Sequence, residues 1–134
     1  MLRIGFIGMG LMGIPMSLRL LQAGFPVMVW NRNPLKVQTP VAAGAIQASS
    51  IAELVAASDI VMLCVTDTQA VEAVVFGPGG IAAAGHARQV LVDFSSIDPE
   101  ATRSMAARLH QQCGMRWVDA PVSGGVAGAE QGTL

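Results

Sequence analysis

Residues 3–17 read RIGFIGMGLMGIPMS, and this stretch decides the fold of the chain. The apolar run of residues 4–7 predicts a buried strand, and apolar residues at helical spacing continue from Ile14 to Gly24. A turn with three glycines in the spacing GxGxxG joins the two segments. Strand, glycine turn and helix in this order predict dinucleotide binding. The alternative is a glycine-rich turn in an α/β domain that binds nothing.

Each glycine of this turn has a physical reason in a dinucleotide site. Gly8 permits the tight turn, Gly10 lets the backbone approach a pyrophosphate, and Gly13 lets the helix pack close to the strand. The unpaired N–H groups and the dipole of the new helix then face the phosphates.

Length and composition predict one domain with a sizeable core. The chain has 134 residues, of which 52% are hydrophobic and 13% are charged, as expected for much buried parallel sheet. A net charge of −1 without Lys or Arg clusters argues against nucleic acid or an anionic membrane as a partner. Glycines and Pro15 break the apolar N-terminal stretch, so we expect no signal peptide, no membrane helix and a cytoplasmic location. Cys64 and Cys113 are expected to be reduced packing residues, and no metal site is predicted.

Strands alternate with helices along the rest of the chain. The strands predicted after the first are residues 26–30, 45–47, 59–65, 90–94 and 117–119. This alternation is the pattern of βαβ units, and it predicts an α/β fold with a doubly wound parallel sheet. Such a sheet binds its ligand beyond the carboxyl ends of its strands.

Capping residues mark where the later helices begin. The predicted starts are Asn33 with Pro34, Ser50 with Glu53 as a capping box, Thr68, and Asp98 with Pro99. Pro40 is expected to end the second helix early, and Gly114 to close the long helix that starts at Pro99. Residues 77–80 are predicted to be a turn, and residues 120–134 to be loop and glycine-rich turn with a possible short helical stretch.

The end of the second predicted strand indicates which dinucleotide is bound. An NAD site usually has Asp or Glu there, about 20 residues past the glycines, to bind the ribose 2′-OH. This chain has Asn31 and Arg32 instead, so a neutral amide and a guanidinium would face a 2′-phosphate. The sequence therefore favours NADP over NAD. In the alternative interpretation, Arg32 is a solvated loop residue.

Two further strand ends carry candidate cofactor contacts. Val65, Thr66 and Asp67 follow the fourth strand and are placed to line the ribose and adenine, or they form an ordinary strand exit. Ser95 and Ser96 follow the fifth strand and are placed to hydrogen-bond the nicotinamide ribose or carboxamide. Two serines before a helix are also ordinary turn chemistry.

The last segment contains a candidate anion site. Ser123, Gly124 and Gly125 follow a strand, so that a hydroxyl and successive N–H groups converge on an anion such as a substrate carboxylate. The alternative is a purely structural turn. Other titratable residues are expected to have structural or surface roles; these are Asp93, Asp119, His86 and His110.

Four motifs occur along the chain in this order: GFIGMGLMGIPM, WNRNP, VDFSSIDP and DAPVSGGVAGAEQGTL. With these motifs the chain resembles the β-hydroxyacid dehydrogenase family from end to end. The resemblance implies NAD(P)-dependent interconversion of a 3-hydroxy acid and its semialdehyde, of the 2-hydroxy-3-oxopropionate reductase or 3-hydroxyisobutyrate dehydrogenase type. The glycine and WNR motifs are also similar to imine reductases, and a non-catalytic cofactor-binding scaffold is a further alternative.

The resemblance also implies roles for particular residues. The adenosine side of NADP, or alternatively NAD, would be held by Gly8, Met9, Gly10, Leu11, Met12, Gly13, Asn31 and Arg32. Val65 and Thr66 would hold the cofactor edge, and Ser96 the nicotinamide end. Ser123, Gly124 and Gly125 would hold the carboxylate of the small semialdehyde or hydroxy acid. Many relatives have Pro in place of Thr66, and many NAD-using relatives have Asp in place of Asn31.

The resemblance implies more structure than residues 1–134 contain. It implies a further strand, a long helix with the catalytic Lys, and an all-helical domain that completes the pocket and a homo-oligomer. Lys36, the one lysine of the chain, lies on the adenosine side and is not a candidate for that role. Residues 1–134 are therefore interpreted as the N-terminal NAD(P)-binding domain, which is expected to bind cofactor but not to turn over.

Overall fold

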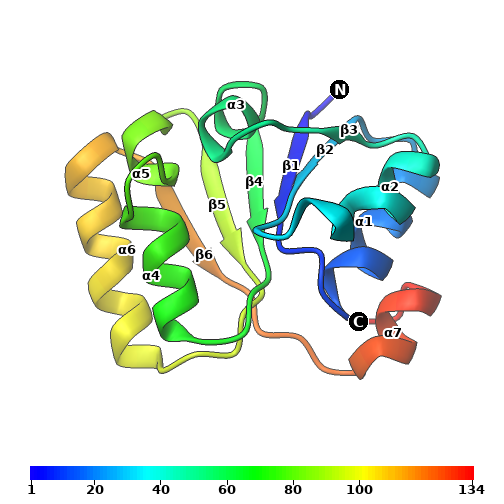
Figure 1. Ribbon diagram of the computed structural model, residues 1–134. Helices are drawn as coiled ribbons and strands as arrows, with labels where there is room; N and C mark the ends of the chain where they lie inside the picture. Colours follow the sequence, from blue (N-terminus) through cyan, green and yellow to red (C-terminus); the bar gives the residue numbers. More distant parts are fainter.

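Six parallel strands form one sheet in the computed structural model, which describes residues 1–134 (Figure 1). They are β1 (Ile4–Ile7), β2 (Val27–Trp30), β3 (Ile46–Gln47), β4 (Ile60–Leu63), β5 (Val90–Asp93) and β6 (Arg116–Asp119). The strand order is β3-β2-β1-β4-β5-β6. The predicted doubly wound α/β fold is confirmed, and every predicted strand is present.

The direction of the chain through the sheet reverses between β1 and β4. From β1 the chain moves outward to β2 and β3, and it then returns to β4 and moves the other way to β5 and β6. Because parallel crossovers are right-handed, this reversal sends the connecting helices to opposite faces. It also opens a crevice beside the carboxyl end of β1, which is where such sheets bind ligands.

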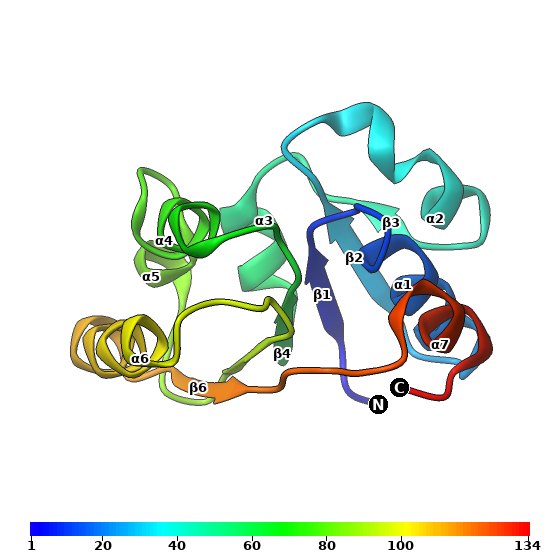
Figure 2. The ribbon, with the colours of Figure 1, turned by 90° about the horizontal axis from the view of Figure 1, so that it is seen from below.

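Helices cover both faces of the sheet. One face carries α1 (Gly13–Gln22), the 3-10 helix η1 (Pro34–Val37), α2 (Gln38–Ala42) and α7 (Gly125–Gln131). The other carries α3 (Ile51–Ala56), α4 (Thr68–Phe76), α5 (Ile81–Ala84) and α6 (Pro99–Cys113) (Figure 2). None of these helices has the length and apolarity needed to cross a bilayer.

The core has one apolar cluster on each face. Phe6, Met9 and Val29 belong to the cluster beneath α1, and Leu63, Leu91 and Leu109 belong to the larger cluster beneath α3 to α6. Every residue of β1 is buried, because this strand lies inside the sheet with helices on both sides. Full burial of each such side chain contributes on the order of 1.5–3 kcal/mol, so these clusters fix the glycine turn that follows β1.

Two helix starts differ from the prediction in detail. Asp67, not Thr68, caps α4: its Oδ1 accepts a hydrogen bond from the Ala70 N–H at 2.8 Å. Ser50 Oγ accepts from the Glu53 N–H as predicted, but the Glu53 carboxylate accepts from the Ser49 N–H rather than returning to Ser50. Asp67 caps α4 in place of Thr68 because a carboxylate is a stronger hydrogen-bond acceptor than a hydroxyl.

Three helical segments also differ from the prediction. Pro40 does not end a helix early; it lies in the first turn of α2, where a missing N–H costs nothing. The short α5 was not predicted, because four residues after a glycine turn carry no periodic signal. Residues 125–131 form α7, so the last segment is more helical than the predicted loop and glycine-rich turn.

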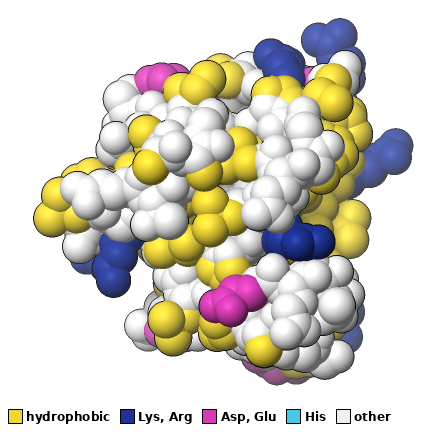
Figure 3. All heavy atoms as spheres, turned by 90° about the vertical axis from the view of Figure 1, so that its right-hand side faces the viewer, with side chains coloured by type: hydrophobic (Ala, Val, Ile, Leu, Met, Phe, Trp, Pro, Cys, Tyr) yellow, Lys and Arg dark blue, Asp and Glu magenta, His cyan; other side chains and the backbone are white.

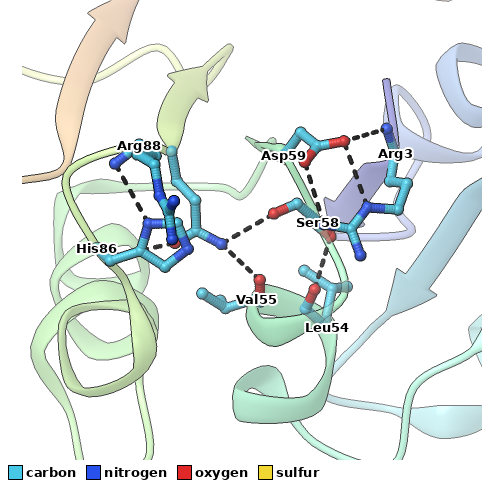
Figure 4. Close-up of polar contacts among 8 residues, drawn as sticks. Arg3, Leu54, Val55, Ser58, Asp59, His86 and Arg88 are labelled. Atoms are coloured by element: carbon cyan, nitrogen blue, oxygen red, sulfur yellow. Dashed lines mark hydrogen bonds and ion pairs between the residues drawn. The ribbon is translucent and has the colours of Figure 1, made fainter. Parts of the chain in front are cut away.

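Polar contacts close the amino edge of the sheet. Gln89 Nε2 donates to the backbone oxygens of Val55 at 2.7 Å and Ser58 at 2.9 Å, from a side chain that is buried (Figure 4). Arg3 bonds the Asp59 carboxylate through its side chain and its backbone N–H, and these bonds hold the pKa of Asp59 below its ordinary value. These contacts lie at the end of the strands opposite the glycine turn.

Candidate functional site

The glycine turn is built so that two of its three positions accept only glycine. Gly8 has φ = +103°, and a Cβ there would collide with the backbone oxygen of Cys64. A Cβ at Gly13 would collide with the backbone oxygen of Gly8. The first glycine therefore makes the turn and the third allows α1 to start against it, which are the two packing roles predicted from the sequence.

Gly10 differs from the other two glycines because no protein atom requires a glycine there. A Cβ at this position would have no heavy atom within 4 Å, and the residue is exposed. The packing of the chain therefore does not explain a glycine at position 10. Open space beside the backbone is what a pyrophosphate approaching this turn needs.

The start of α1 offers free hydrogen-bond donors in the same place. The N–H groups of Gly10, Leu11 and Met12 have no hydrogen-bond partner within the chain. No side chain caps this ten-residue helix, and its first turn holds no acidic residue. Free N–H groups and a positive helix end form an anion-binding surface, and neither is neutralised by the protein.

Asn31 holds the glycine turn from the end of β2. Its Oδ1 accepts from the Met9 N–H at 2.8 Å, and its Nδ2 donates to the Asn33 backbone oxygen at 3.0 Å. Both ends of the amide are therefore used within the chain. The sequence indicated only the missing negative charge at position 31, because Asn31 and Met9 are far apart along the chain and no local pattern reveals their bond.

Arg32, next to Asn31, is exposed and forms no ion pair or hydrogen bond with another residue. Its side chain borders two adjoining hollows, one on each side of the end of β2. The guanidinium is therefore free to bind an anion that enters either hollow.

A cleft of about 610 Å³ opens at the carboxyl edge, where the strand order reverses. It reaches from the ends of β1, β2 and β4 to the start of α3, and along α4 to the turn that follows that helix. Of the predicted site residues, it is lined by Gly8, Asn31, Arg32 and Val65. The volume lies in the range of small-molecule and cofactor sites.

The other predicted residues are distributed around this cleft. Met9, Gly10 and Leu11 line a neighbouring hollow of about 380 Å³ that also reaches Lys36 and Glu130. Thr66, Ser96 and Ser123 are exposed and line neither space. A separate cavity of about 290 Å³ beneath α7 contains none of the predicted site residues.

The two serines after β5 have different surroundings. Ser96 is exposed, whereas Ser95 is buried and its Oγ accepts from the Val65 N–H at 2.9 Å. The Ser95 N–H donates in turn to Asp93 Oδ1 at 2.9 Å. Ser95 is therefore a link between two strand exits, so Ser96 alone of the pair is open to a ligand.

Asp93 is fully buried at the end of β5. Burial raises the pKa of its carboxyl, and the hydrogen bonds from Ser95 only partly oppose that shift. Its Oδ2 has no hydrogen-bond partner. Asp119 pairs with Asp93 in the register of β5 and β6, but it is exposed, so the two carboxyls have different surroundings.

Ser123, Gly124 and Gly125 lie at the exposed start of α7. Gly124 and Gly125 have φ values of +118° and +61°, in the left-handed region that favours glycine. Hydrophobic side chains are exposed between a few charged ones on this side of the molecule (Figure 3). The helix that follows Gly124, α7, packs beside α1. The segment is therefore held near the glycine turn.

The remaining titratable residues gather in no metal site. No group of three or more His, Cys, Asp or Glu side chains is placed to share an ion. Both cysteines are free thiols, and burial together with the charge of Asp93 raises the pKa of Cys64. His86 accepts from the Arg88 N–H at the amino edge, away from the cleft.

Known proteins share the sequence and the fold of this chain. Residues 3–134 match the family model for the NAD-binding domain of 6-phosphogluconate dehydrogenase. The chain is 43% identical over 133 residues to 2-(hydroxymethyl)glutarate dehydrogenase of Eubacterium barkeri, covering 99% of this chain and 44% of that protein. It is 38% identical over 133 residues to 2-hydroxy-3-oxopropionate reductase of Escherichia coli K12, covering 99% of this chain and 45% of the relative.

A solved structure, Psf3 in complex with NADP+ and 2-OPP, superposes with a TM-score of 0.91 at 35% identity. The match covers 96% of this chain and 45% of that one. The chain thus spans less than half the length of each of these three proteins. The matches confirm the resemblance indicated by the sequence motifs.

Proposed function

Because the chain belongs to the family of the NAD-binding domain of 6-phosphogluconate dehydrogenase, we propose that it holds the dinucleotide of an NAD(P)-dependent oxidoreductase. The reaction is the interconversion of a 3-hydroxy acid and its semialdehyde, of the 2-hydroxy-3-oxopropionate reductase or 3-hydroxyisobutyrate dehydrogenase type. The relative named 2-hydroxy-3-oxopropionate reductase supports this reaction class. Residues 1–134 form the cofactor-binding domain of that enzyme.

The observation that carries the proposal is the open space at Gly10 beside three free N–H groups. The pyrophosphate lies against Gly10, where it accepts hydrogen bonds from the N–H groups of Leu11 and Met12 at the start of α1. The adenosine half occupies the side of the cleft of about 610 Å³ that Asn31 and Arg32 border, and the cofactor passes Val65 at the exit of β4 on its way to the nicotinamide end. These groups are already in place, so binding requires little rearrangement.

The cofactor of this proposal is NADP, with NAD as the alternative. Arg32 is exposed and unpaired at the rim of the cleft, where it supplies a charge-assisted contact to a 2′-phosphate. Asn31 places no negative charge beside that phosphate, because its side chain is a neutral amide that bonds Met9 and Asn33. The solved relative in complex with NADP+ supports the same choice.

The reacting end of the site is assigned to the exits of β4, β5 and β6. Val65 and Thr66 border the cofactor, and the Ser96 hydroxyl bonds its nicotinamide end. Ser123, Gly124 and Gly125 bind the substrate carboxylate, which fixes the carbonyl carbon for transfer. When bound, the nicotinamide supplies or accepts the hydride. Lys36 borders the hollow on the far side of the glycine turn and has no part in proton transfer.

Titration with NADPH and NADH tests the proposal. Trp30 lines the cleft, so quenching of its fluorescence reports binding. We expect both cofactors to bind and NADPH to bind more tightly. Gly10→Val should abolish quenching while the melting temperature stays close to that of the wild type, because a Cβ at this position meets no protein atom. Wild-type affinity in Gly10→Val would contradict the proposal.

A further inference from the structure

We propose that Asp93 is a positioning residue for the nicotinamide half of the cofactor, acting through Ser95 on the loop that follows β4. The inference rests on the proposed function and deepens it. It assigns a role to two buried side chains that are not themselves open to a ligand.

A chain of two hydrogen bonds connects the exits of neighbouring strands. Asp93 Oδ1 accepts from the Ser95 N–H at 2.9 Å, and Ser95 Oγ accepts from the Val65 N–H at 2.9 Å. Asp93 is 0% exposed and Ser95 is 3% exposed, so water does not compete for either bond. The position of Val65 is thus coupled to the carboxyl group at the end of β5.

Backbone bonds bring a third strand exit to the same point. The Asp93 backbone oxygen accepts from the Ala120 N–H at 2.9 Å, at the exit of β6. The Phe94 N–H donates to the Leu63 backbone oxygen at 2.8 Å, at the exit of β4. Asp93 and the next two residues therefore join the three segments that carry the proposed nicotinamide and substrate contacts.

The energetics of Asp93 favour a positional role over a stabilising one. Its Oδ2 is buried without a partner, and an unsatisfied buried acceptor destabilises the fold. Its raised pKa reflects the same desolvation. An apolar side chain in this place would remove the unsatisfied oxygen but would also leave the buried Ser95 N–H without its acceptor, so the carboxyl is retained for the bond that it makes to Ser95. Asp93 thus lowers the stability of the fold but holds the loops after β4 and β5 in place. A binding site needs such a residue where the distance between its ligand contacts must stay constant.

The two halves of the cofactor should respond differently when this link is broken. Loss of the Ser95 hydroxyl leaves the Val65 N–H without its acceptor, so the loop of residues 65–67 moves relative to Ser96. Arg32 and Gly10 form no hydrogen bond with Ser95 or Asp93, so the grip on the 2′-phosphate and pyrophosphate should remain. A general structural role would weaken both halves together.

The test compares Ser95→Ala with Ser58→Ala as a matched control. Both serines are buried, at 3% and 2% exposed, and each hydroxyl makes a hydrogen bond to backbone. Ser58 lies at the amino edge, where its Oγ donates to the Leu54 oxygen at 2.6 Å. The probes are NADPH, which has both halves, and 2′,5′-ADP, which lacks the nicotinamide half.

We expect Ser95→Ala to weaken NADPH binding by roughly five- to tenfold, as for loss of one hydrogen bond, with 2′,5′-ADP unchanged. Ser58→Ala should change neither affinity. Asp93→Asn keeps an acceptor for the Ser95 N–H and should retain most NADPH affinity, whereas Asp93→Leu should resemble Ser95→Ala.

Equal weakening of both probes in Ser95→Ala, or NADPH affinity equal to that of Ser58→Ala, would overturn the inference. Ser95→Ala breaks the bond from the Val65 N–H and leaves the bond from the Ser95 N–H to Asp93 in place, so Asp93→Leu tests the Asp93 bond; wild-type NADPH affinity in Asp93→Leu that melts cooperatively would also overturn the inference. If the wild-type protein binds neither NADPH nor 2′,5′-ADP, the proposed function itself is wrong. Wild-type binding with an unaffected Ser95→Ala rejects the positioning role alone.

Discussion

The side-chain oxygen of Asn31 lies 2.8 Å from the backbone nitrogen of Met9 and accepts its hydrogen, which joins the end of β2 to the glycine turn. Asn31→Asp keeps this acceptor, but it loses the donor to the Asn33 oxygen and puts a negative charge beside the proposed 2′-phosphate. We expect NADPH affinity to fall at least about tenfold and NADH affinity to change little, because like charges a few ångströms apart repel strongly. Fluorescence titration of both cofactors measures this ratio.

A second substitution at Asn31 separates the two effects. Asn31→Ala removes the acceptor without adding charge, so the glycine turn loosens and both cofactors should bind more weakly. A fall confined to NADPH in Asn31→Ala would contradict the role of Asn31 in holding Met9.

Arg32 is expected to select between the two cofactors. Arg32→Ala removes the one charged group that borders both hollows at the end of β2, and NADPH affinity should fall roughly tenfold while NADH affinity stays the same. Arg88→Ala is the control, since Arg88 is also exposed but lies at the amino edge. Isothermal titration of both variants with both cofactors measures the difference. Equal weakening of NADPH and NADH by Arg32→Ala would contradict a contact with the 2′-phosphate, and no change in either affinity would show that Arg32 is a solvated loop residue.

The pKa of Asp93 gives stability a defined pH dependence. Its carboxyl binds a proton more tightly in the folded chain than in the unfolded chain. The free energy of unfolding should therefore fall as pH rises from about 4, the ordinary carboxyl pKa, to the raised pKa of Asp93, and then stay level. The negative charge of Asp119 on the neighbouring strand moves this pKa in the same direction as burial does.

Melting curves of the wild type and of Asp93→Asn isolate the contribution of Asp93 to stability. They are recorded at a series of pH values that begins at about 4, the ordinary carboxyl pKa. The difference in melting temperature, wild type minus variant, should decrease as pH rises. Subtraction removes the opposite contribution of Asp59, whose lowered pKa makes stability fall at low pH. A difference that is constant across the range would contradict the raised pKa of Asp93.

Gln89 is expected to matter for stability and not for binding. Gln89→Met leaves the Ser58 oxygen without a donor and the His86 N–H without an acceptor, whereas the Val55 oxygen keeps the Ser58 N–H; the free energy of unfolding should fall by about 2–4 kcal/mol. Urea unfolding measures the loss, and Gln112→Met at an exposed position of α6 is the control. Cofactor affinity per folded molecule should be unchanged, and a selective loss of affinity would contradict the separation of the two edges.

The parts of this structure that depend on local pattern could be predicted from the sequence. Apolar runs and capping residues located all six strands, and the spacing of Gly8, Gly10 and Gly13 located the turn between β1 and α1. Asp98 and Gly114 bound α6 at its two ends as predicted. Local chemistry suffices here because each of these features depends on residues that are close together along the chain.

Features that depend on distant residues were missed. Nothing in the pattern at Ser95 and Ser96 says which hydroxyl turns inward, because the answer depends on Val65 of another strand exit. The bond between Asn31 and Met9 likewise exists only after β1 and β2 have paired. The predicted roles of Thr66, Ser96, Ser123, Gly124 and Gly125 stay predictions, as does the cytoplasmic location.

The empty surroundings of Gly10 have a practical consequence for protein engineering. Exchanging glycine for alanine where the backbone allows it commonly raises stability by about 0.4–1 kcal/mol, and no atom of this chain opposes that exchange at position 10. A library selected for heat resistance or yield would therefore retain Gly10→Ala. Such stabilised variants would no longer bind the dinucleotide, and a screen for melting temperature alone would not detect this loss. Any attempt to stabilise this domain therefore has to measure nucleotide binding as well as melting temperature.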